Sequence, residues 1–425
     1  MKKLIYFVLV TLVIALVGCA AQPVSGDVIK SDKPRNTSPV VDKADMDSLV
    51  NGNNTFNFDL YQALRKTDGN IFYSPYSISE ALAMTYAGAR GDTEKTIADA
   101  LEFSLSQERL HPAFNKLDLE LKKRGQGAQG KDAKGFRLNV VNAIWGQKDF
   151  SFQSQFLDTL AVNYGAGLRI LDFITQTEKS RVTINDWVAD QTENRIKDLI
   201  PQGVITNMTR LVLTNAIYFN AAWMYPFKTE NTSNGAFHLL NGSNVTMPMM
   251  KQTQSFRYAE GANYQAVELP YDGNELSIII LLPKEGQIEA FEKALNGETY
   301  KEIVNKLGTR SVTLTMPKFE YESSFGLKQA LTDLGMGVAF NPDTADLSGI
   351  SGKRDLYIQD VIHKAFVSVD EAGTEAAAAT AVIVGTTSAP QPATMTIDRP
   401  FIFVIRDIAT GSTIFTGRVM NPVVI

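Results

Sequence analysis

Two stretches of the chain carry the apolar spacing of amphipathic helices. SISEALAMTYAGARGDTEKTIADAL begins at Ser77, and either Ser77 or Ser79 is a plausible amino-terminal cap. RVTINDWVADQTENRIKDLI (181–200) has similar spacing, and Pro201 and Gly203 follow it, as expected beyond the end of a helix. The pattern therefore predicts at least two well-formed helices before the middle of the chain.

Other stretches have the spacing of strands. RLVLTNAIYFNAAW (210–223) and LSIIILLP (276–283) are mostly apolar without strict alternation, which is typical of strands buried on both faces. SVTLTMPKFEYESS (311–324) alternates, and RPFIFVIRDIATGSTIFTGRVMNP (399–422) reads as two strands joined at Thr410-Gly411. Because helices and strands mix without strict alternation, the fold class expected is α+β with large sheets.

The amino terminus has the features of an export signal. MKKLIYFVLVTLVIALVGCA has two lysines, then an apolar run to Val17, then small residues. This arrangement indicates a secretory signal peptide over residues 1–18, too short an apolar run to span a membrane comfortably. Leu16-Val17-Gly18-Cys19 resembles a lipobox, and Cys19 is the only cysteine of the chain. We expect lipidation at Cys19, which would anchor the protein to a membrane without crossing it.

The rest of the chain divides at the end of a polar, proline-containing stretch. Residues 19–54 lack a sustained apolar period and are expected to form a flexible tether. No second linker follows, so residues 55–425 are predicted to form one large domain.

Composition and motifs argue against an enzyme and against a nucleic-acid-binding protein. The net charge is −5, without a cluster of basic residues and aromatics. No metal-binding, phosphate-loop or nucleophile-elbow motif is present. Only three histidines occur, and His363, between strand-like flanks, is best interpreted as a hydrogen-bonded core histidine. We therefore expect no catalytic residue, no metal and no cofactor.

One segment near the carboxyl end suits several conformations. EAGTEAAAATAVIVGTTSAP (371–390) has five alanines between Ala376 and Ala381, then a β-branched run, then small polar residues. Read as a strand, one face from Thr374 to Val384 is entirely small or apolar, and the other carries Glu375. Such a face would slide between existing strands with little steric resistance. A short surface helix from Glu375 to Val382 is the alternative.

This segment and several others resemble the serpins, the serine protease inhibitor family. VIHKAFVSVDEAGTEAAAATA resembles the hinge of the serpin reactive-centre loop. NIFYSPYSISEALAMTYAGARGDT, NAIYFNAAWMYPF, FGLKQALTDLGMGVAF, ADLSGIS and the carboxy-terminal RPFIFVIRDIATGSTIFTGRVMNP resemble further serpin segments, in the order of that family. The resemblance covers nearly all of residues 56–425, and no internal repeat competes with it.

The resemblance implies a fold of three β-sheets, with a large central sheet, eight to nine helices and an exposed reactive-centre loop. It also implies suicide-substrate inhibition of serine endopeptidases. The target cleaves the loop and forms an acyl-enzyme, and the cut loop then inserts into the central sheet and distorts the protease. We expect a monomer that forms a covalent complex with its target and binds no nucleic acid. A serpin-fold surface lipoprotein that acts as a non-inhibitory binding module is the alternative.

Site residues follow from the same resemblance. The matching sheet-opening cluster comprises Ser74, Ser77, Asn215, His363 and Trp223. The matching loop hinge comprises Glu371, Gly373, Thr374, Glu375, Ala376, Ala377, Ala378, Ala379 and Thr380.

The position of the reactive bond follows from counting along the hinge. Counting from Gly373 places it between Thr387 and Ser388, with Thr386 and Ala389 as alternatives because the following segment is slightly long. These residues are small and uncharged, so elastase-like or subtilisin-like serine proteases are the expected targets, and papain-like cysteine proteases are a second class. The expected location is outside a prokaryotic cell, anchored by lipid to its membrane or envelope.

Overall fold

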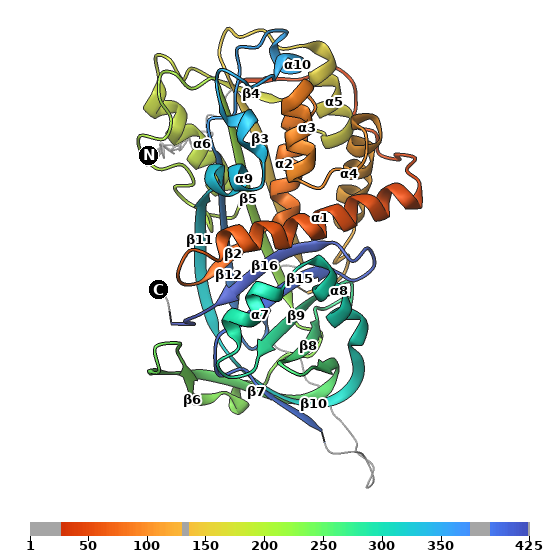
Figure 1. The fold of residues 1–425 in the computed structure, drawn as a ribbon, viewed down its shortest axis with the longest axis vertical. Coiled ribbons are helices and arrows are strands. Elements are labelled where there is room, and N and C mark those ends of the chain that lie inside the picture. Colours follow the sequence, from red (N-terminus) through yellow and green to blue (C-terminus); the bar gives the residue numbers. More distant parts are fainter. Residues whose placement is uncertain (1–26, 130–135, 375–391, 424–425) are drawn as a thin grey trace, which may run out of the picture.

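The long strands of the molecule run along its vertical axis, and most helices gather around their upper ends (Figure 1). The computed structural model describes residues 27–129, 136–374 and 392–423. The helices in these ranges are α1 Lys43–Leu64, α2 Pro75–Tyr86, α3 Gly91–Ala100, α4 Gln107–Leu121, α5 Ser154–Tyr164, α6 Thr177–Gln191, α7 Ile288–Ala294, α8 Gly297–Lys306, α9 Lys328–Asp333 and α10 Ser348–Ser351, with short 3-10 turns η1 Thr229–Asn231 and η2 Met336–Phe340.

The described strands form two hydrogen-bonded sheets. The seven-stranded large sheet has the order β1 Asp27–Ile29, β4 Leu168–Leu171, β3 Arg137–Gln147, β5 Leu211–Ala222, β12 Val361–Val369 and β11 Phe319–Gly326, and β13 Gly373–Thr374 also pairs with β5. The nine-stranded sheet has the order β14 Ala393–Thr396, β10 Gly308–Pro317, β7 Asn244–Glu260, β8 Tyr264–Pro270, β9 Leu276–Pro283, β15 Phe401–Asp407, β16 Thr413–Val419 and β2 Ile71–Tyr73, and β6 Ser233–His238 pairs with β7.

The predicted α+β class is confirmed, but the numbers of sheets and helices differ from those expected. Two sheets are seen in the described residues instead of three, because the 17-residue strand β7 pairs with β6 near its start and with β8 near its end. One continuous strand therefore joins what would otherwise be separate sheets. The described residues form ten helices instead of eight to nine, and the additional ones include the four-residue α10.

The large sheet separates two apolar cores. Strand β5 is buried along nearly its whole length, as the apolar run from Arg210 predicts. Leu213, Ile217 and Phe219 on one face belong to the main core, which extends into the nine-stranded sheet and helices α1 to α5. Ala216 on the other face belongs to a smaller core with Ile184 of α6. Any strand added beside β5 would therefore bury both of its faces.

The helices differ in detail from the sequence-based expectation. The first predicted stretch is split into α2 and α3, and its amino-terminal cap is Ser74 rather than Ser77 or Ser79. The Ser74 side chain accepts a hydrogen bond from the Ser77 backbone, and proline occupies the first helical turn, a common capping arrangement. Helix α6 ends at Gln191, and Glu193 and Asn194 have the positive φ angles that terminate a helix.

Part of the expected tether is folded. Helix α1 begins at Lys43, and it buries Leu49, Val50 and Asn53, all of which precede the predicted domain start. Residues 27–29 form β1, which pairs with β4 at the edge of the large sheet. The pattern was misleading because residues 27–42 are mostly polar and are held by hydrogen bonds and ion pairs, and only the start of α1 adds apolar residues such as Leu49 and Val50. In the described part of the chain, no helix is long and apolar enough to cross a membrane.

Candidate functional site: a buried cluster and a strand-forming hinge

Four of the predicted site residues meet beneath the large sheet, where α2 begins. Ser74 caps α2, Ser77 lies in its first turn, Asn215 lies on β5 and His363 lies on β12. All four residues are fully buried. His363 and Asn215 are register partners on adjacent parallel strands, so the cluster joins the two strands that would separate if the sheet opened.

The hydrogen bonds around His363 define its tautomer. The backbone N–H of Ser74 donates to Nε2 of His363 over 3.2 Å, so Nε2 carries no proton. Nδ1 therefore carries the proton and donates to Oδ1 of Asn215. Burial lowers the pKa of His363 to about 3, and the imidazole is neutral near physiological pH. Protonation of Nε2 would direct its N–H against that of Ser74, so the closed cluster requires a neutral histidine.

The cluster extends to two residues that the sequence reasoning missed. Nδ2 of Asn215 donates to Oγ of Ser77 and to Oδ1 of Asn142 on β3, both at 2.6 Å. Nδ2 of Asn142 in turn donates to Oε2 of Glu80 on α2 over 2.8 Å. Asn142 interrupts an apolar run of β3, which gives no signal of its role, and Glu80 stands within the apolar spacing of a helix. Burial and the Asp118 carboxylate raise the pKa of Glu80 to about 8.

The hinge begins as a short strand paired with β5. After β12 ends at Val369, the chain turns, and Gly373 and Thr374 pair antiparallel with Ala222 and Ala221. Strand β12 pairs with β5 only from Val361 to Ala365, so the far end of β5 is available to the hinge. The chain that leaves β12 thus returns to the neighbouring strand.

The close approach at this point requires glycine. Gly373 has a φ of +153°, and a Cβ there would lie 2.3 Å from the carbonyl oxygen of Ala221 and 2.6 Å from Cα of Ala222. A side chain would therefore displace either the hinge or β5.

Trp223 lies at the hinge and does not contact the buried cluster. Its ring stacks on Tyr271 with centroids 4.8 Å apart. Its Nε1 donates to the carbonyl of Asp370 over 2.9 Å, and its backbone N–H donates to the carbonyl of Ala372 over 2.8 Å. Trp223 is thus placed to hold the turn that precedes Gly373.

Glu371 ties the same turn to the body. Its Oε1 accepts a hydrogen bond from Thr232 over 2.8 Å, and its Oε2 lies 2.8 Å from Nζ of Lys318. Burial acts to raise the pKa of Glu371, but the Lys318 ammonium and the surrounding donors outweigh it, and the pKa is lowered overall. Glu371 is therefore held as a carboxylate.

The remaining predicted site residues lie outside the described residues. These are Glu375, Ala376, Ala377, Ala378, Ala379 and Thr380 of the hinge, Thr386, Thr387, Ser388 and Ala389 around the predicted reactive bond, and Cys19.

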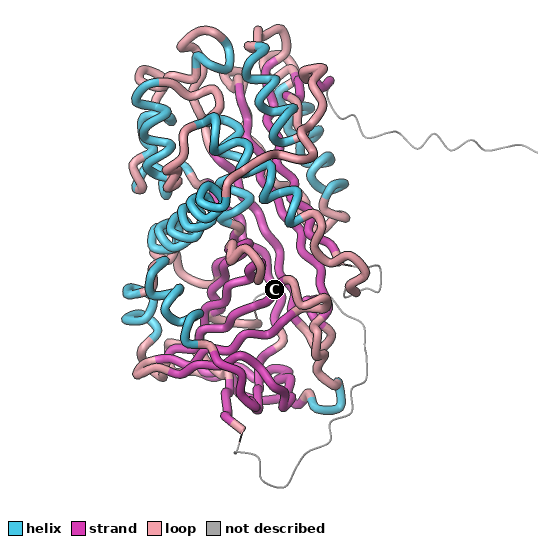
Figure 2. Tube along the Cα trace, turned by 90° about the vertical axis from the view of Figure 1, so that its right-hand side faces the viewer, coloured by secondary structure: helices cyan, strands magenta, loops and turns pink. Residues whose placement is uncertain are grey.

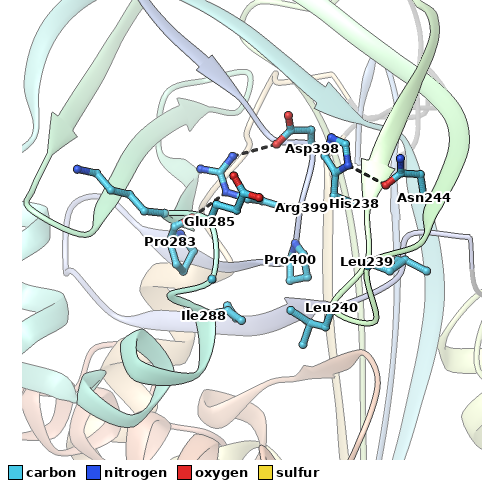
Figure 3. Close-up of a pocket in the computed structure, with 13 residues that line it drawn as sticks. His238, Leu239, Leu240, Asn244, Pro283, Glu285, Ile288, Asp398, Arg399 and Pro400 are labelled. Carbon is cyan, nitrogen blue, oxygen red and sulfur yellow. Dashed lines mark hydrogen bonds and ion pairs between the residues drawn. The ribbon is translucent and has the colours of Figure 1, made fainter.

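A surface pocket of about 580 Å³ lies beside the segment that leads into β15. Figure 3 shows Arg399 directed toward Asp398, and His238 toward Asn244. Ile288 and Pro400 also line it, and none of the predicted site residues does. The pocket is therefore separate from the hinge and the cluster.

Comparison with known proteins assigns the family. The family model described as serpin (serine protease inhibitor) matches residues 51–422. The chain belongs to the serpin family. Two animal serpins are similar over most of the chain. Antithrombin-III from Mus musculus is 40% identical over 88% of this chain and 82% of its own length. Leukocyte elastase inhibitor from Homo sapiens is 39% identical over 89% of this chain and 100% of its own length.

Prokaryotic and structural relatives agree with this assignment. An uncharacterized serpin-like protein of Thermococcus kodakarensis is 40% identical over 92% of this chain and 90% of its own length. The native state of tengpin, a thermophilic serpin, superposes with a TM-score of 0.79 at 29% identity over 92% of this chain and 97% of tengpin. The serpin fold expected from the motifs is thereby confirmed.

Proposed function

We propose that this serpin is an irreversible suicide-substrate inhibitor of serine endopeptidases that traps its target by inserting the cleaved loop into the large sheet. The observation that carries the proposal is the pairing of Gly373 and Thr374 with β5. The first two residues of an inserted strand already lie in the antiparallel register that insertion requires.

Extending this register shows why the following residues suit insertion. The next positions would place Ala376 opposite Phe219, and Ala378 opposite Ile217, both members of the main core. Residues opposite each other in a sheet share a face, so the small face of the hinge would meet that core. Alanine fits beside these large side chains without displacing them.

Insertion supplies enough free energy to be irreversible. About a dozen backbone positions would gain strand hydrogen bonds, at roughly 0.5–1.5 kcal/mol net each. Burial of the small face adds to this. The total is comparable to the roughly 5–15 kcal/mol that stabilises a typical protease domain. The uncleaved protein is then a kinetically trapped state whose loop is held out of the sheet.

The loop sequence supports small-pocket proteases as targets. No lysine, arginine or large aromatic residue occurs between residues 372 and 396, which argues against trypsin-like and chymotrypsin-like specificity. The similarity to leukocyte elastase inhibitor supports an elastase-like target. Subtilisin-like proteases, which also have small specificity pockets, are proposed as the other target class. The proposed bond joins Thr387 and Ser388, with Thr386 or Ala389 at the alternative bonds, and papain-like cysteine proteases are a lesser target class.

The proposed site of action is the outside of a prokaryotic cell, with the chain anchored through lipid on Cys19. The lipobox-like sequence before the only cysteine supports this location. Mass spectrometry of the mature amino-terminal peptide tests it. A diacylated peptide beginning at Cys19 is expected, and an unmodified peptide beginning elsewhere would refute the anchor.

The inhibitory proposal is tested by mixing the protein with pancreatic elastase, subtilisin, trypsin and chymotrypsin before denaturing gel electrophoresis. We expect a complex that survives denaturation with elastase or subtilisin. Mass spectrometry of the released carboxy-terminal peptide then identifies the cleaved bond. If every protease cuts the loop and remains fully active, the chain does not inhibit these classes, and the binding-module alternative gains support.

A further inference from the structure

The segment before α1 crosses the outside of the large-sheet edge. We call residues 27–42 the N-terminal strap. Its β1 pairs with β4, Lys33 forms an ion pair with Asp158 of α5 at 2.7 Å, and the backbone N–H of Asn36 donates to the carbonyl of Val162 over 2.9 Å. The strap thus links the edge of the sheet to α5 and then continues to α1.

Arg35 connects the strap to α4. Its Nε donates to Oδ1 of Asn115 over 2.8 Å, and one terminal nitrogen contacts Oδ2 of Asp118 at 2.5 Å. The side chains of Arg35 and Asp118 are only 17% and 7% exposed. Gly165, at the carboxyl end of α5, makes room for the arginine, because a Cβ there would lie 2.9 Å from Cδ of Arg35. The packing is therefore specific to this residue.

Glu80 links this ion pair to the buried cluster. Asn142 on β3 donates to one carboxyl oxygen over 2.8 Å, and the Tyr76 hydroxyl donates to the other over 3.3 Å. The same Asn142 contacts Asn215 and Ser77, the residues that join β5 to the start of α2. A path of hydrogen bonds therefore runs from Glu80 through Asn142 to the point where β5 meets β12, and the Arg35–Asp118 pair acts on Glu80 through its charges.

The charged and titratable groups that act on Glu80 come from several elements. Asp118 and Lys122 lie on α4, Arg35 on the strap, and Tyr76 on α2 itself. Tyr164 of α5 interacts with it as well. Asp118 disfavours an ionised Glu80, whereas Arg35 and Lys122 favour it. The two members of the Arg35–Asp118 pair therefore act on Glu80 in opposite directions.

We propose that Arg35 and Asp118 set the ionisation of Glu80, and that Glu80 is a positioning residue that makes the opening of the large sheet, and hence loop insertion, depend on pH. This inference rests on the inhibitory function proposed above. Glu80 acts through Asn142, which must move with β3 when β5 separates from β12.

The direction of the effect follows from burial. In the closed sheet, Glu80 is protonated below its pKa of about 8, because an ionised carboxyl there is poorly solvated. Opening the sheet admits water and lowers that pKa, so a rise in pH through this range favours the open sheet. Each pKa unit of difference between the two states changes the opening equilibrium about tenfold. Insertion is therefore expected to speed up between about pH 7 and 9.

The test uses the full-length protein and a labelled synthetic peptide with the sequence of residues 374–385, which enters the sheet without any protease. The rate of peptide incorporation is measured from pH 6 to 9.5 by native gel. Wild type is expected to accelerate with pH, and Glu80→Gln to give a flat profile, because the amide copies the neutral carboxyl. Arg35→Gln is expected to move the midpoint to higher pH, and Asp118→Asn to lower pH.

Two further variants separate this role from a merely structural one. Arg35→Lys keeps the positive charge. The pH midpoint of its incorporation rate is therefore expected to lie closer to the wild-type value than the midpoint of Arg35→Gln does. Lys33→Ala removes another ion pair of the strap without touching Glu80, and it is expected to keep the wild-type midpoint. Opposite shifts from Arg35→Gln and Asp118→Asn would not arise from a general loosening of the strap.

The outcomes distinguish this inference from the proposed function. A wild-type profile that is flat, a Glu80→Gln profile that still rises, or shifts of Arg35→Gln and Asp118→Asn in the same direction would overturn the role of Glu80 while leaving insertion intact. If the peptide enters the wild-type sheet at no pH, insertion itself is refuted, and the inference falls with it.

Discussion

Thr374 lies opposite Ala221 of β5, in antiparallel register, although it follows the strand that ends at Val369 on the other side of the sheet opening. The hinge has therefore already crossed from β12 to β5 before the alanine-rich segment begins. In the proposed mechanism, insertion lengthens an existing pairing rather than starting a new one. The costly first step of bringing the two strands together has been taken in the native state.

Thr374→Arg tests whether insertion must bury the side chain at this position. A long charged side chain that insertion has to bury would be costly without a partner, so insertion should slow. The acyl-enzyme then hydrolyses before it is trapped. We expect several molecules of inhibitor to be cleaved per molecule of elastase inactivated, measured by titrating residual protease activity.

Thr229→Arg is the matched control, because Thr229 lies in the exposed turn η1. It should leave the inhibitory stoichiometry at the wild-type value. Equal stoichiometry in Thr374→Arg and wild type would show that insertion does not bury the side chain at this position.

Gly373→Ala tests the close contact at the start of β13. The new Cβ would collide with the backbone of β5, so the pairing of Gly373 and Thr374 should be lost. Amide hydrogen exchange at Trp223, whose N–H donates to Ala372, should become at least about tenfold faster if about 1.4 kcal/mol of local stability is lost. Gly308→Ala, at a position with free space around it, is the control and should leave this exchange unchanged. Unaltered protection in Gly373→Ala would mean that the hinge does not need glycine there.

His363→Gln tests the neutral histidine of the cluster. Burial lowers the pKa of His363 from 6.5 to about 3, so between these values the unfolded chain binds a proton that the native state does not. Stability is present above pH 6.5 and is lost as pH falls toward 3, by up to about 1.4 kcal/mol per pH unit for this one group.

Glutamine offers one donor and one acceptor but cannot be protonated in this range. Urea unfolding between pH 7 and 4.5 should therefore give His363→Gln a smaller slope of unfolding free energy against pH than wild type. His111, whose pKa burial lowers to about 4, keeps its own contribution in both proteins. An unchanged slope would show that His363 is protonated without cost in the native state.

Much of the fold was predictable because its motifs are local. The apolar run around β5 and the hairpin around Thr410 appear in the structure nearly as predicted, with Gly411 at the positive φ angle expected of the turn. In these elements the spacing of apolar residues and the turn chemistry point to the same structure. Four of the five predicted cluster residues also lie together, and because Asn215 and His363 are 148 positions apart, it was the resemblance to the serpins and not local spacing that predicted this.

The parts that were missed depend on contacts between distant segments. Glu80 looks like an ordinary helix residue until Asn142, on a strand more than sixty positions away in sequence, is placed beside it. The N-terminal strap has the sequence pattern of a tether because Lys33 and Arg35 bind by charge to α5 and α4. Such ion pairs do not require a periodic spacing of apolar residues in the sequence. The cap at Ser74 does not stand out in the sequence, because Ser77 and Ser79 are equally good capping residues by type.

The most direct test of loop insertion is the melting temperature before and after cleavage of the loop. The protein is cut with a protease that it does not trap, and the cleaved and intact forms are compared by calorimetry. The proposed mechanism predicts that cleavage raises the melting temperature markedly, because the freed hinge extends its pairing with β5 and completes the sheet. An unchanged or lower melting temperature, with the cut confirmed by mass spectrometry, would contradict insertion.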